Sequence, residues 1–472
     1  MTLTDATMLV AGSMIGSGIF IVSADIGRTV GSPLWLLLAW VVAGIVTMLG
    51  ALAYGELAAM YPRAGGQYVF LREALGPLTG FLYGWTLFVI IQTGTIAAVA
   101  VAFGRFLGVL WPAITPDRFS WFPQFDFQTP GGPVQLGLSP QRLIALITIW
   151  ILTWINLRGV KEAKWVQTTL TAVKTGALGL LILLGLTIGR HAAAVTANFG
   201  SGHFNTRDVS AAFIIAFGSA LVGSLFSSDA WNNVTFAAAE VKEPQRNLPR
   251  ALLYGTGLVS LLYILANVAY LNVLPLHGVE NGADVISRGI QYATQDRVGS
   301  AVAETIFGAA GATMMAAAIL ISTFGCNNGL ILSGARVYYA MARDKLFFAG
   351  AGRLNKNHVP ASALIVQSIW TSLLCLTGTY GQLLNYVIFA ALVFYALTTI
   401  GLFRLRKTRP DIERPYKALG YPVLPALYIV LSSAIAIILL IADKTRSQAI
   451  SGLVLVALGI PVYFIWRKVE AS

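Results

Sequence analysis

Residues 12–18 read Gly-Ser-Met-Ile-Gly-Ser-Gly, and residues 223–229 read Gly-Ser-Leu-Phe-Ser-Ser-Asp. Each stretch lies in the middle of an apolar segment that is long enough to cross a membrane as a helix. Glycine in a helix interior costs about 1 kcal/mol relative to alanine, so both stretches are candidate helix breaks. The sequence therefore predicts two membrane-spanning helices that are interrupted near their centres.

The composition of the chain is that of a membrane protein. Of its 472 residues, 56% are hydrophobic and 11% are charged, and the mean hydropathy is +0.72. A soluble domain carries about 25% charged residues, so this chain has too few charges to cover a surface that faces water. Its apolar blocks predict an all-α membrane protein with about twelve transmembrane helices. The expected spans are 6–28, 33–58, 78–110, 141–157, 166–189, 209–239, 248–274, 303–335, 360–378, 382–403, 423–441 and 448–466.

The placement of the basic residues predicts the orientation of the chain. The formal charge is +12, and Lys and Arg cluster in alternate connections, at 158–164, 242–250, 336–356 and 404–417. Basic loops mark the cytoplasmic side of a membrane protein. We therefore expect both termini in the cytoplasm, the lipid bilayer as the environment, and no nucleic acid partner. If the chain is bacterial, spanning helices of this kind predict the inner (cytoplasmic) membrane.

The N-terminus and the cysteines add two expectations. The chain runs from Asp5 directly into a spanning segment, so no cleavable signal peptide is expected. Cys326 and Cys375 both lie in apolar segments, which predicts no disulfide framework.

The two interrupted spans are the first and the sixth, which suggests two halves of five helices each. Because five is odd, the second half would be inverted relative to the first. The expected units are 1–190 for helices 1–5, 206–403 for helices 6–10, and 404–472 for helices 11 and 12. Interrupted helices at matching positions of two inverted halves are the sequence pointer to a transporter binding site.

The predicted breaks offer two kinds of backbone group. A break at Gly16, Ser17 and Gly18 frees N–H groups, which favour an anion such as a carboxylate. A break at Phe226–Asp229 frees carbonyl groups, which suit an ammonium. Together they match a free α-amino acid. The alternative is that these small residues only permit close helix packing, since Gly12 and Gly16 form a Gly-x-x-x-Gly pair.

Several charged residues lie within or at the ends of the spans. Asp229 either caps the freed amides of the second half-helix or holds a substrate ammonium indirectly. Lys174 either extends to the cytoplasmic face or is a buried ammonium that replaces a transport cation or exchanges a proton. Arg105 is expected to reach the outer surface from the end of helix 3. Glu240 is expected to form an interfacial ion pair beside Lys242.

Motifs of enzymes are missing from the sequence. It contains no Gly-x-x-x-x-Gly-Lys-Ser/Thr, no His-Glu-x-x-His and no Gly-x-Ser-x-Gly. We therefore predict no catalytic residue, no metal ligand, no cofactor and no enzymatic activity.

Four motifs resemble the amino acid–polyamine–organocation superfamily. Gly12-Ser-Met-Ile-Gly-Ser-Gly-Ile-Phe20 resembles its helix 1 motif, and Glu73-Ala-Leu-Gly-Pro77 lies in a stretch similar to its first cytoplasmic loop. Phe226-Ser-Ser-Asp-Ala-Trp-Asn232 resembles helix 6. Ser322-Thr-Phe-Gly-Cys-Asn-Asn-Gly329 is similar to helix 8 of the L-type amino acid transporter subfamily. The resemblance covers most of helices 1–10.

The resemblance implies a LeuT-like fold of five-plus-five inverted repeats that works by alternating access. By position, Ser17, Gly18 and Ile19 would bind the substrate carboxylate, and Phe226 would be a lid over the substrate. Lys174 matches a helix 5 lysine that replaces the second sodium ion, and Tyr263 matches a helix 7 tyrosine that can reach it. The whole predicted substrate site consists of Ile15, Gly16, Ser17, Gly18, Ile19, Phe226, Ser227, Ser228 and Asp229.

The chain departs from the animal members of this subfamily in two ways. Its loop 111–140 lacks the cysteine that tethers a heavy subunit, so we expect a monomer without a disulfide-linked partner. Position 229 is Asp where many animal members have Gly, so the pocket is expected to differ in size or charge.

The sequence thus predicts a sodium-independent amino acid transporter that exchanges small or neutral L-amino acids. Gly, Ser and Ala dominate around both breaks, and Phe226 closes the site above them. The alternative is proton-coupled symport through Lys174. A polyamine carrier is less favoured because no cluster of intramembrane acids is present, and a nutrient sensor would be expected to carry long soluble extensions.

Overall fold

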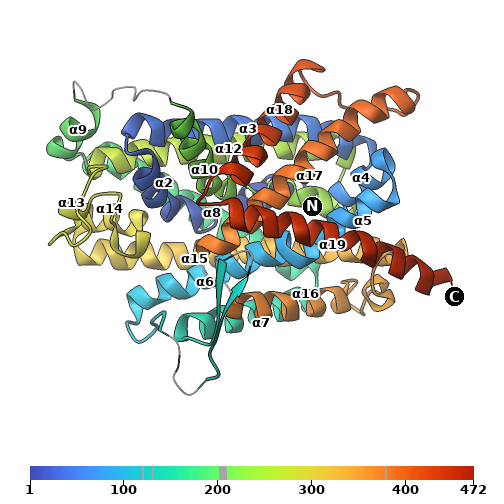
Figure 1. Cartoon of the computed structure of the whole chain (residues 1–472), viewed down its shortest axis with the longest axis horizontal. Helices are drawn as coiled ribbons and strands as arrows, with labels where there is room; N and C mark the ends of the chain where they lie inside the picture. The colour runs from blue at the N-terminus through green and yellow to red at the C-terminus, as the bar shows by residue number, and fades with distance from the viewer. Residues whose placement is uncertain (118, 120–121, 130–131, 201–209, 378–379, 472) are drawn as a thin grey trace.

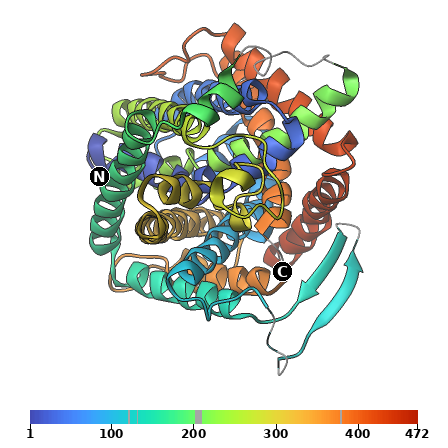
Figure 2. The same ribbon diagram turned by 90° about the vertical axis from the view of Figure 1, so that its left-hand side faces the viewer.

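The computed structural model describes residues 1–117, 119, 122–129, 132–200, 210–377 and 380–471. They form a bundle of long helices that run roughly parallel to one axis (Figure 1). Figure 2 views the same bundle from one end, with most helices seen along their axes.

The first part of the chain contains one interrupted helix followed by four long spans. Its elements are α1 (Leu3–Met14), α2 (Val22–Val30), α3 (Pro33–Met60), α4 (Gln67–Leu75), α5 (Pro77–Thr86), α6 (Gln92–Leu110), α7 (Pro140–Arg158), α8 (Val160–Leu186) and the short α9 (Ala192–Phe199). A π-helical turn, Leu87–Ile91, joins α5 to α6 without a break.

The second part begins with another interrupted helix. Its elements are α10 (Ala211–Ser227), α11 (Asn233–Phe236), α12 (Pro244–Val273), α13 (Val285–Arg288), α14 (Val298–Phe307), α15 (Ala309–Arg343), α16 (Ala361–Thr377), α17 (Tyr380–Thr408), α18 (Val423–Ile441) and α19 (Arg446–Ala471).

The helix pattern agrees with the predicted spans. Within the described residues, nine helices are long and apolar enough to cross a membrane. The other three predicted spans are the interrupted pairs α1–α2 and α10–α11 and the 17-residue α16. The membrane fold of about twelve spans is therefore confirmed. The division into repeats at 1–190 and 206–403, with 404–472 outside them, stays a prediction.

Two predicted spans were wrong in detail. The eighth does not run unbroken from 303, because α14 ends at Phe307 and Gly308 adopts a φ of 66° before α15 begins. Glycine allows this left-handed backbone without strain, and a single glycine in an apolar run gave no visible boundary. The sixth is helical only to Ser227 in its first half, and α11 has four residues. Residue 209, its expected start, lies outside the described residues.

Two connections complete the comparison. Residues 378–379, between the predicted spans 360–378 and 382–403, lie outside the described residues, and α16 ends before them and α17 begins after them. The loop 111–140 is not purely irregular, since β1 (Phe125–Thr129) pairs antiparallel with β2 (Gly132–Leu136). Figure 2 shows this hairpin outside the helical bundle, so the predicted all-α membrane fold holds for the spanning part of the protein.

The interior of the bundle is built by the interrupted helices and their neighbours. α12 packs along α3 and α1, and α15 packs along α6 and α8. Small residues set these distances: a Cβ on Gly255 would lie 2.5 Å from Val10, and one on Gly12 would lie 2.2 Å from the Gln167 amide. The packing interpretation of Gly12 is therefore correct, and it fixes α1 against α8.

Candidate functional site

The first helix is interrupted where the sequence predicted. α1 ends at Met14, Ile15 has extended backbone angles, and a single 3₁₀ turn at Gly18–Phe20 precedes α2. The last carbonyls of α1 and the first amides of α2 consequently lack partners within one continuous helix. Ile15 to Ile19 are all buried, so these groups lie in the interior of the bundle.

The sixth span is interrupted at Ser228–Asn232, between α10 and α11. Ala230 has a φ of 63°, a left-handed conformation that costs energy for a residue with a Cβ. Phe226, Ser227, Ser228 and Asp229 are buried at the end of α10, with exposed fractions between 2% and 7%. Both predicted breaks are therefore confirmed as backbone features.

The two breaks lie against each other. A Cβ on Gly18 would be 2.1 Å from the Ser227 hydroxyl oxygen and 3.1 Å from the Ser227 Cα. The hydroxyl of Tyr263, from α12, lies 3.0 Å from the Met14 carbonyl and 3.1 Å from the Ser227 carbonyl. Tyr263 thus connects the ends of α1 and α10, and its predicted contact with Lys174 stays a prediction.

Lys174 points into the bundle. Its side chain is 1% exposed, and its ammonium donates to the carbonyls of Gly12 at 2.5 Å and Ile15 at 2.6 Å. A third carbonyl, that of Ser322 in α15, lies 3.4 Å away. The alternative in which Lys174 extends to the cytoplasmic face was wrong, because the carbonyls freed at the helix 1 break hold it inside.

Sequence reasoning missed part of this region. The Ser322 hydroxyl donates to the carbonyls of Ile15 and Gly16, each at 3.1 Å. The Cys326 thiol lies 3.1 Å from the Ser13 carbonyl. Both residues belong to the stretch 322–329 that carried the helix 8 resemblance, so a signal was present. The resemblance identified helix 8, but it did not indicate that this helix, α15, packs over the helix 1 break.

Asp229 contacts Tyr395, which no sequence pattern marked as a site residue. The hydroxyl of Tyr395, from α17, donates to the Asp229 carboxylate. Asp229 also lies between two small cavities. The first is lined on its polar side by Thr47, Ser228 and Tyr428, and the second by Tyr83, Gln92, Asn232 and Asn233. The acid therefore faces polar space inside the bundle on the side of the break that leads to α11.

Ion pairs gather at the end of the bundle where the basic clusters lie. Glu240 binds the guanidinium of Arg336 at 2.6 Å, so an ion pair forms as expected, although Arg336 and not the adjacent Lys242 is its partner. Glu56 is fully buried and binds Arg406 at 2.6 Å and the backbone amide of Ala418 at 2.7 Å.

A third ion pair at this end involves Glu73 and Arg409, at 2.9 Å. Burial alone would raise the pKa of the Glu73 carboxyl, but hydrogen bonds from Arg72 and Arg409 hold that pKa below its ordinary value.

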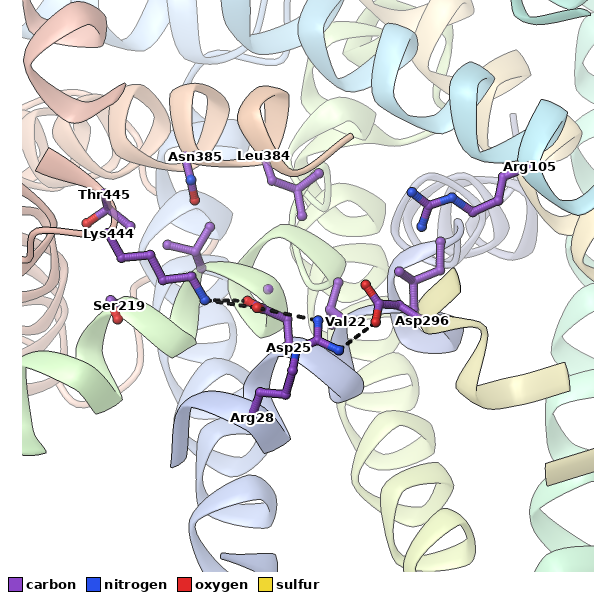
Figure 3. A pocket seen from close by; sticks show the side chains of 13 residues that line it. Val22, Asp25, Arg28, Arg105, Ser219, Asp296, Leu384, Asn385, Lys444 and Thr445 are labelled. Atoms are coloured by element: carbon purple, nitrogen blue, oxygen red, sulfur yellow. Dashed lines mark hydrogen bonds and ion pairs between the residues drawn. The ribbon is translucent and has the colours of Figure 1, made fainter. Parts of the chain in front are cut away.

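The opposite end of the bundle contains an open cavity with charged walls, called here the Asp25 cavity (Figure 3). Its lining residues are Ile21, Val22, Asp25, Arg28, Arg105, Ser219, Val222, Gly223, Asp296, Leu384, Asn385, Lys444 and Thr445. Arg105 lies at this end as expected, half buried, and donates to the Gln295 carbonyl at 3.3 Å. Gly223 is one helical turn before Phe226, so the cavity leads toward the two breaks.

The chain is similar to known proteins over nearly its whole length. A family model described as amino acid permease matches residues 1–465. The human large neutral amino acids transporter small subunit 2 is 31% identical, over 98% of this chain and 79% of its own length. The serine/threonine exchanger SteT of Bacillus subtilis is 30% identical, over 99% of this chain and 96% of its own. The mouse b(0,+)-type amino acid transporter 1 is 28% identical, over 97% and 86%.

Proposed function

The chain belongs to the amino acid permease family and is a multi-pass amino acid transporter, and on this premise we propose that it is a sodium-independent exchanger of small, neutral L-amino acids. The substrate is bound between the interrupted helices, carried across by alternating access and released without chemical change. The following observations support each part of this proposal.

The helix breaks support recognition of an α-amino acid. The amides of Ser17, Gly18 and Ile19 at the start of the outer half-helix suit a carboxylate, since helix N-termini favour anions. The carbonyls at the end of α10, near Phe226, suit an ammonium. Because Gly18 and Ser227 are in contact, both ends of the substrate are within reach of one small volume.

Sodium independence is carried by one observation, the ammonium of Lys174 among the carbonyls of Gly12, Ile15 and Ser322. Carbonyl oxygens are the ligands that a hard cation needs. A lysine that already supplies the positive charge at these oxygens removes the need for a sodium ion there.

Proton-coupled symport is the second candidate, and the same lysine favours it. The amine of Lys174 is buried between α1, α8 and α15, and transfer of its proton to water on one side of the membrane would weaken its hydrogen bonds to the α1 carbonyls. The two candidates differ in what they require outside the protein, either a second amino acid or a proton gradient.

Small neutral substrates are favoured by the residues at the breaks. Gly18 packs directly against Ser227, so the backbones at the two breaks lie close together. One relative, from Bacillus subtilis, is named a serine/threonine exchanger. Other relatives are named for large neutral amino acids, so the size of the substrate's side chain is the first property to test.

We further propose a monomer in a bacterial inner membrane with both termini in the cytoplasm. The basic clusters at 158–164, 242–250, 336–356 and 404–417 support that orientation. Both cysteines are free and buried, in α15 and α16, which supports the expectation of no disulfide-linked subunit.

Counterflow into proteoliposomes tests the proposal. The purified protein is reconstituted with one unlabelled amino acid inside, and uptake of a labelled panel is followed in sodium-free buffer. We expect uptake of small neutral amino acids only into loaded vesicles, unchanged by sodium. Uptake that requires sodium would overturn the role given to Lys174, and uptake into unloaded vesicles driven by a proton gradient would establish symport instead.

A further inference from the structure

A second cavity lies at the same end of the bundle as the Asp25 cavity, and no part of the proposed function uses it. It is called here the Arg297 cavity, and its volume is about 190 Å³, well above the roughly 15 Å³ that one water molecule needs. Its lining comes from α13 and α14, at the left of Figure 1, and from the ends of α6 and α15. The polar lining residues are Arg288, Thr294, Arg297, Ser300 and Glu304.

Local backbone structure positions two arginines at this cavity. A capping box at Asp284 fixes the one-turn helix α13, and Arg288 is the last residue of that helix. Gln295 and Asp296 have positive φ angles of 52° and 59°, and Arg297 follows this tight turn directly before α14. Both guanidinium groups are therefore carried by short backbone segments of defined conformation.

Several donors at the cavity lack an acceptor. The Nε atom of Arg288 and the hydroxyl of Ser300 are buried and have no hydrogen-bond partner in the described part of the chain. Ser300 as a whole is 6% exposed. The Nε atom of Arg297 donates to the Thr294 carbonyl at 3.2 Å. Neither guanidinium lies within 4.0 Å of a carboxylate among the residues that the structure describes. Because unpaired buried donors are costly and rare, these groups indicate an acceptor that comes from outside the chain.

The electrostatics of the cavity favour an anion. Two arginines and one acid, Glu304, line it, so the side chains leave one positive charge in excess. The N-cap residue of α14 makes no side-chain hydrogen bond to the first amides of that helix, and the positive end of the helix dipole adds to the excess. Burial lowers the pKa of the Arg297 guanidinium, and the charge of Arg105 lowers this pKa more than Glu304 raises it. The net potential at Arg297 is therefore positive.

The directions of the donors match a phosphate group. Arg288 comes from α13, Arg297 from the turn before α14, and Ser300 from the first turn of α14. A phosphate has oxygens on all sides and can accept from several directions at once, whereas a carboxylate has its two oxygens on one edge. Arginine binds phosphate oxygens through paired N–H groups, and these charge-assisted hydrogen bonds are the strong ones.

We propose that the Arg297 cavity is a binding site for a phosphate group, to which Arg288, Arg297 and the Ser300 hydroxyl donate hydrogen bonds. Two sources share this chemistry, free inorganic phosphate and the headgroup of a phospholipid. The second source is included because Phe307, one turn after Glu304, and Trp111, just after α6, are 46% and 65% exposed and offer apolar surface to acyl chains. The site does not depend on which amino acid is transported.

Ligand-dependent unfolding of the purified protein tests the site. The protein is freed of phospholipid in detergent at low ionic strength, and its unfolding temperature is measured with sodium phosphate or with phosphatidic acid. Sodium chloride of equal ionic strength and diacylglycerol with the same acyl chains are the controls, since both lack the phosphate. We expect phosphate in at least one form to raise the unfolding temperature, because a ligand that binds only the folded state stabilises it. A response to the ion supports the free source, and a response to phosphatidic acid alone supports the lipid.

Variants of the lining residues connect the effect to the cavity. Arg288→Gln and Arg297→Gln should each weaken phosphate binding at least about tenfold, because each removes a charge-assisted hydrogen bond. Arg297→Lys keeps the charge and should lose less affinity than Arg297→Gln. Ser300→Ala should weaken binding about three- to tenfold. Arg190→Gln is the matched control, since it removes an exposed arginine just after α8 that does not line the cavity, and it should bind phosphate as the wild type does.

Two results would overturn the site. The first is a wild-type protein whose unfolding temperature responds neither to inorganic phosphate nor to phosphatidic acid. The second is equal affinity in the wild type, Arg288→Gln and Arg297→Gln, which means that phosphate binds elsewhere. If an arginine variant fails to fold, Ser300→Ala, which removes a single hydroxyl, provides the same comparison. Amino acid exchange is not the readout, so failure of this site and failure of the proposed function are distinguishable.

Discussion

The ammonium of Lys174 donates a hydrogen bond of 2.6 Å to the carbonyl of Ile15, the residue at which helix 1 stops being helical. A side chain from α8 thus satisfies the backbone that the break has freed. Removing it would leave at least two buried carbonyls without their charged donor, and such groups cost about 1–3 kcal/mol each.

Lys174→Gln is therefore expected to lose more than about 90% of the exchange rate and to unfold at a lower temperature. Glutamine can reach one carbonyl but carries no charge, so the carbonyls at the end of α1 lose their fixed cation. Counterflow and thermal unfolding in detergent measure the two effects. Full exchange by this variant would show that the ammonium has no part in transport.

Gly18→Ala should separate the two breaks. The added Cβ would lie 2.1 Å from the Ser227 hydroxyl and 3.1 Å from its backbone, which cannot be relieved by rotating one side chain. Overpacking of this kind costs about 1–3 kcal/mol, and we expect KM to rise at least about tenfold. Gly176→Ala in α8 is the matched control, since nothing lies within 4 Å of its added Cβ. An unchanged KM for Gly18→Ala would argue against a site between the breaks.

Tyr263→Phe removes the hydroxyl that lies between the Met14 and Ser227 carbonyls. We expect a loss of about 1–2 kcal/mol in stability, because a buried carbonyl loses its donor, together with a slower exchange rate. Tyr338→Phe provides the comparison. The Tyr338 hydroxyl is buried and has no hydrogen-bond partner among the described residues, so its removal should change neither quantity. Equal effects of the two substitutions would contradict the bridging role.

Glu56→Gln should destabilise the end of the bundle that carries the basic clusters. Glu56 is fully buried and binds Arg406 and the Ala418 amide. Neutralising one member of a buried ion pair costs about 3–5 kcal/mol. Glu243→Gln, whose carboxylate is exposed and 3.8 Å from Arg246, should be neutral. Thermal unfolding distinguishes the two, and a neutral Glu56→Gln would show that the arginines find other partners.

Acid should weaken the contacts of Glu73. Its pKa is lower in the folded protein than the ordinary value of 4.5, so its contribution to stability is present above that value. The contribution is lost as the pH falls through the folded-state pKa. Arg409→Gln removes one of the two guanidinium groups that lower this pKa, and it should flatten the pH dependence of unfolding below about pH 5. An identical acid profile for this variant would count against the pair.

The positions of the two breaks were predictable because similar stretches rich in glycine and serine lie mid-span in both the first and the sixth helix. The break at Gly308 was not, since one glycine near the end of a span resembles many that only allow packing. The sequence alone did not determine whether the Lys174 side chain points to the surface or to the interior, and the reason is physical. A lysine two turns inside a helix reaches either the surface or the interior, and only the freed carbonyls of α1 decide between them.

Contacts between distant segments were the least predictable part of the site. Tyr395 is 166 positions from Asp229, and Ser322 is more than 300 from Ile15 and Gly16. No local pattern marks such partners. The pattern of small and apolar residues predicted the two helix breaks. The side chains that complete the site come from α12, α15 and α17, and their positions depend on tertiary packing.

The contact between Lys444 and Asp25 connects the last two helices, which lie outside the predicted repeats, to α2. Lys444 belongs to the connection between α18 and α19, and Asp25 belongs to the short outer half-helix α2. Any tilt of α2 must either stretch this contact or pull the connection with it. The last two helices are therefore tied to α2 by an exposed ion pair, which a tilt of α2 would break at little cost.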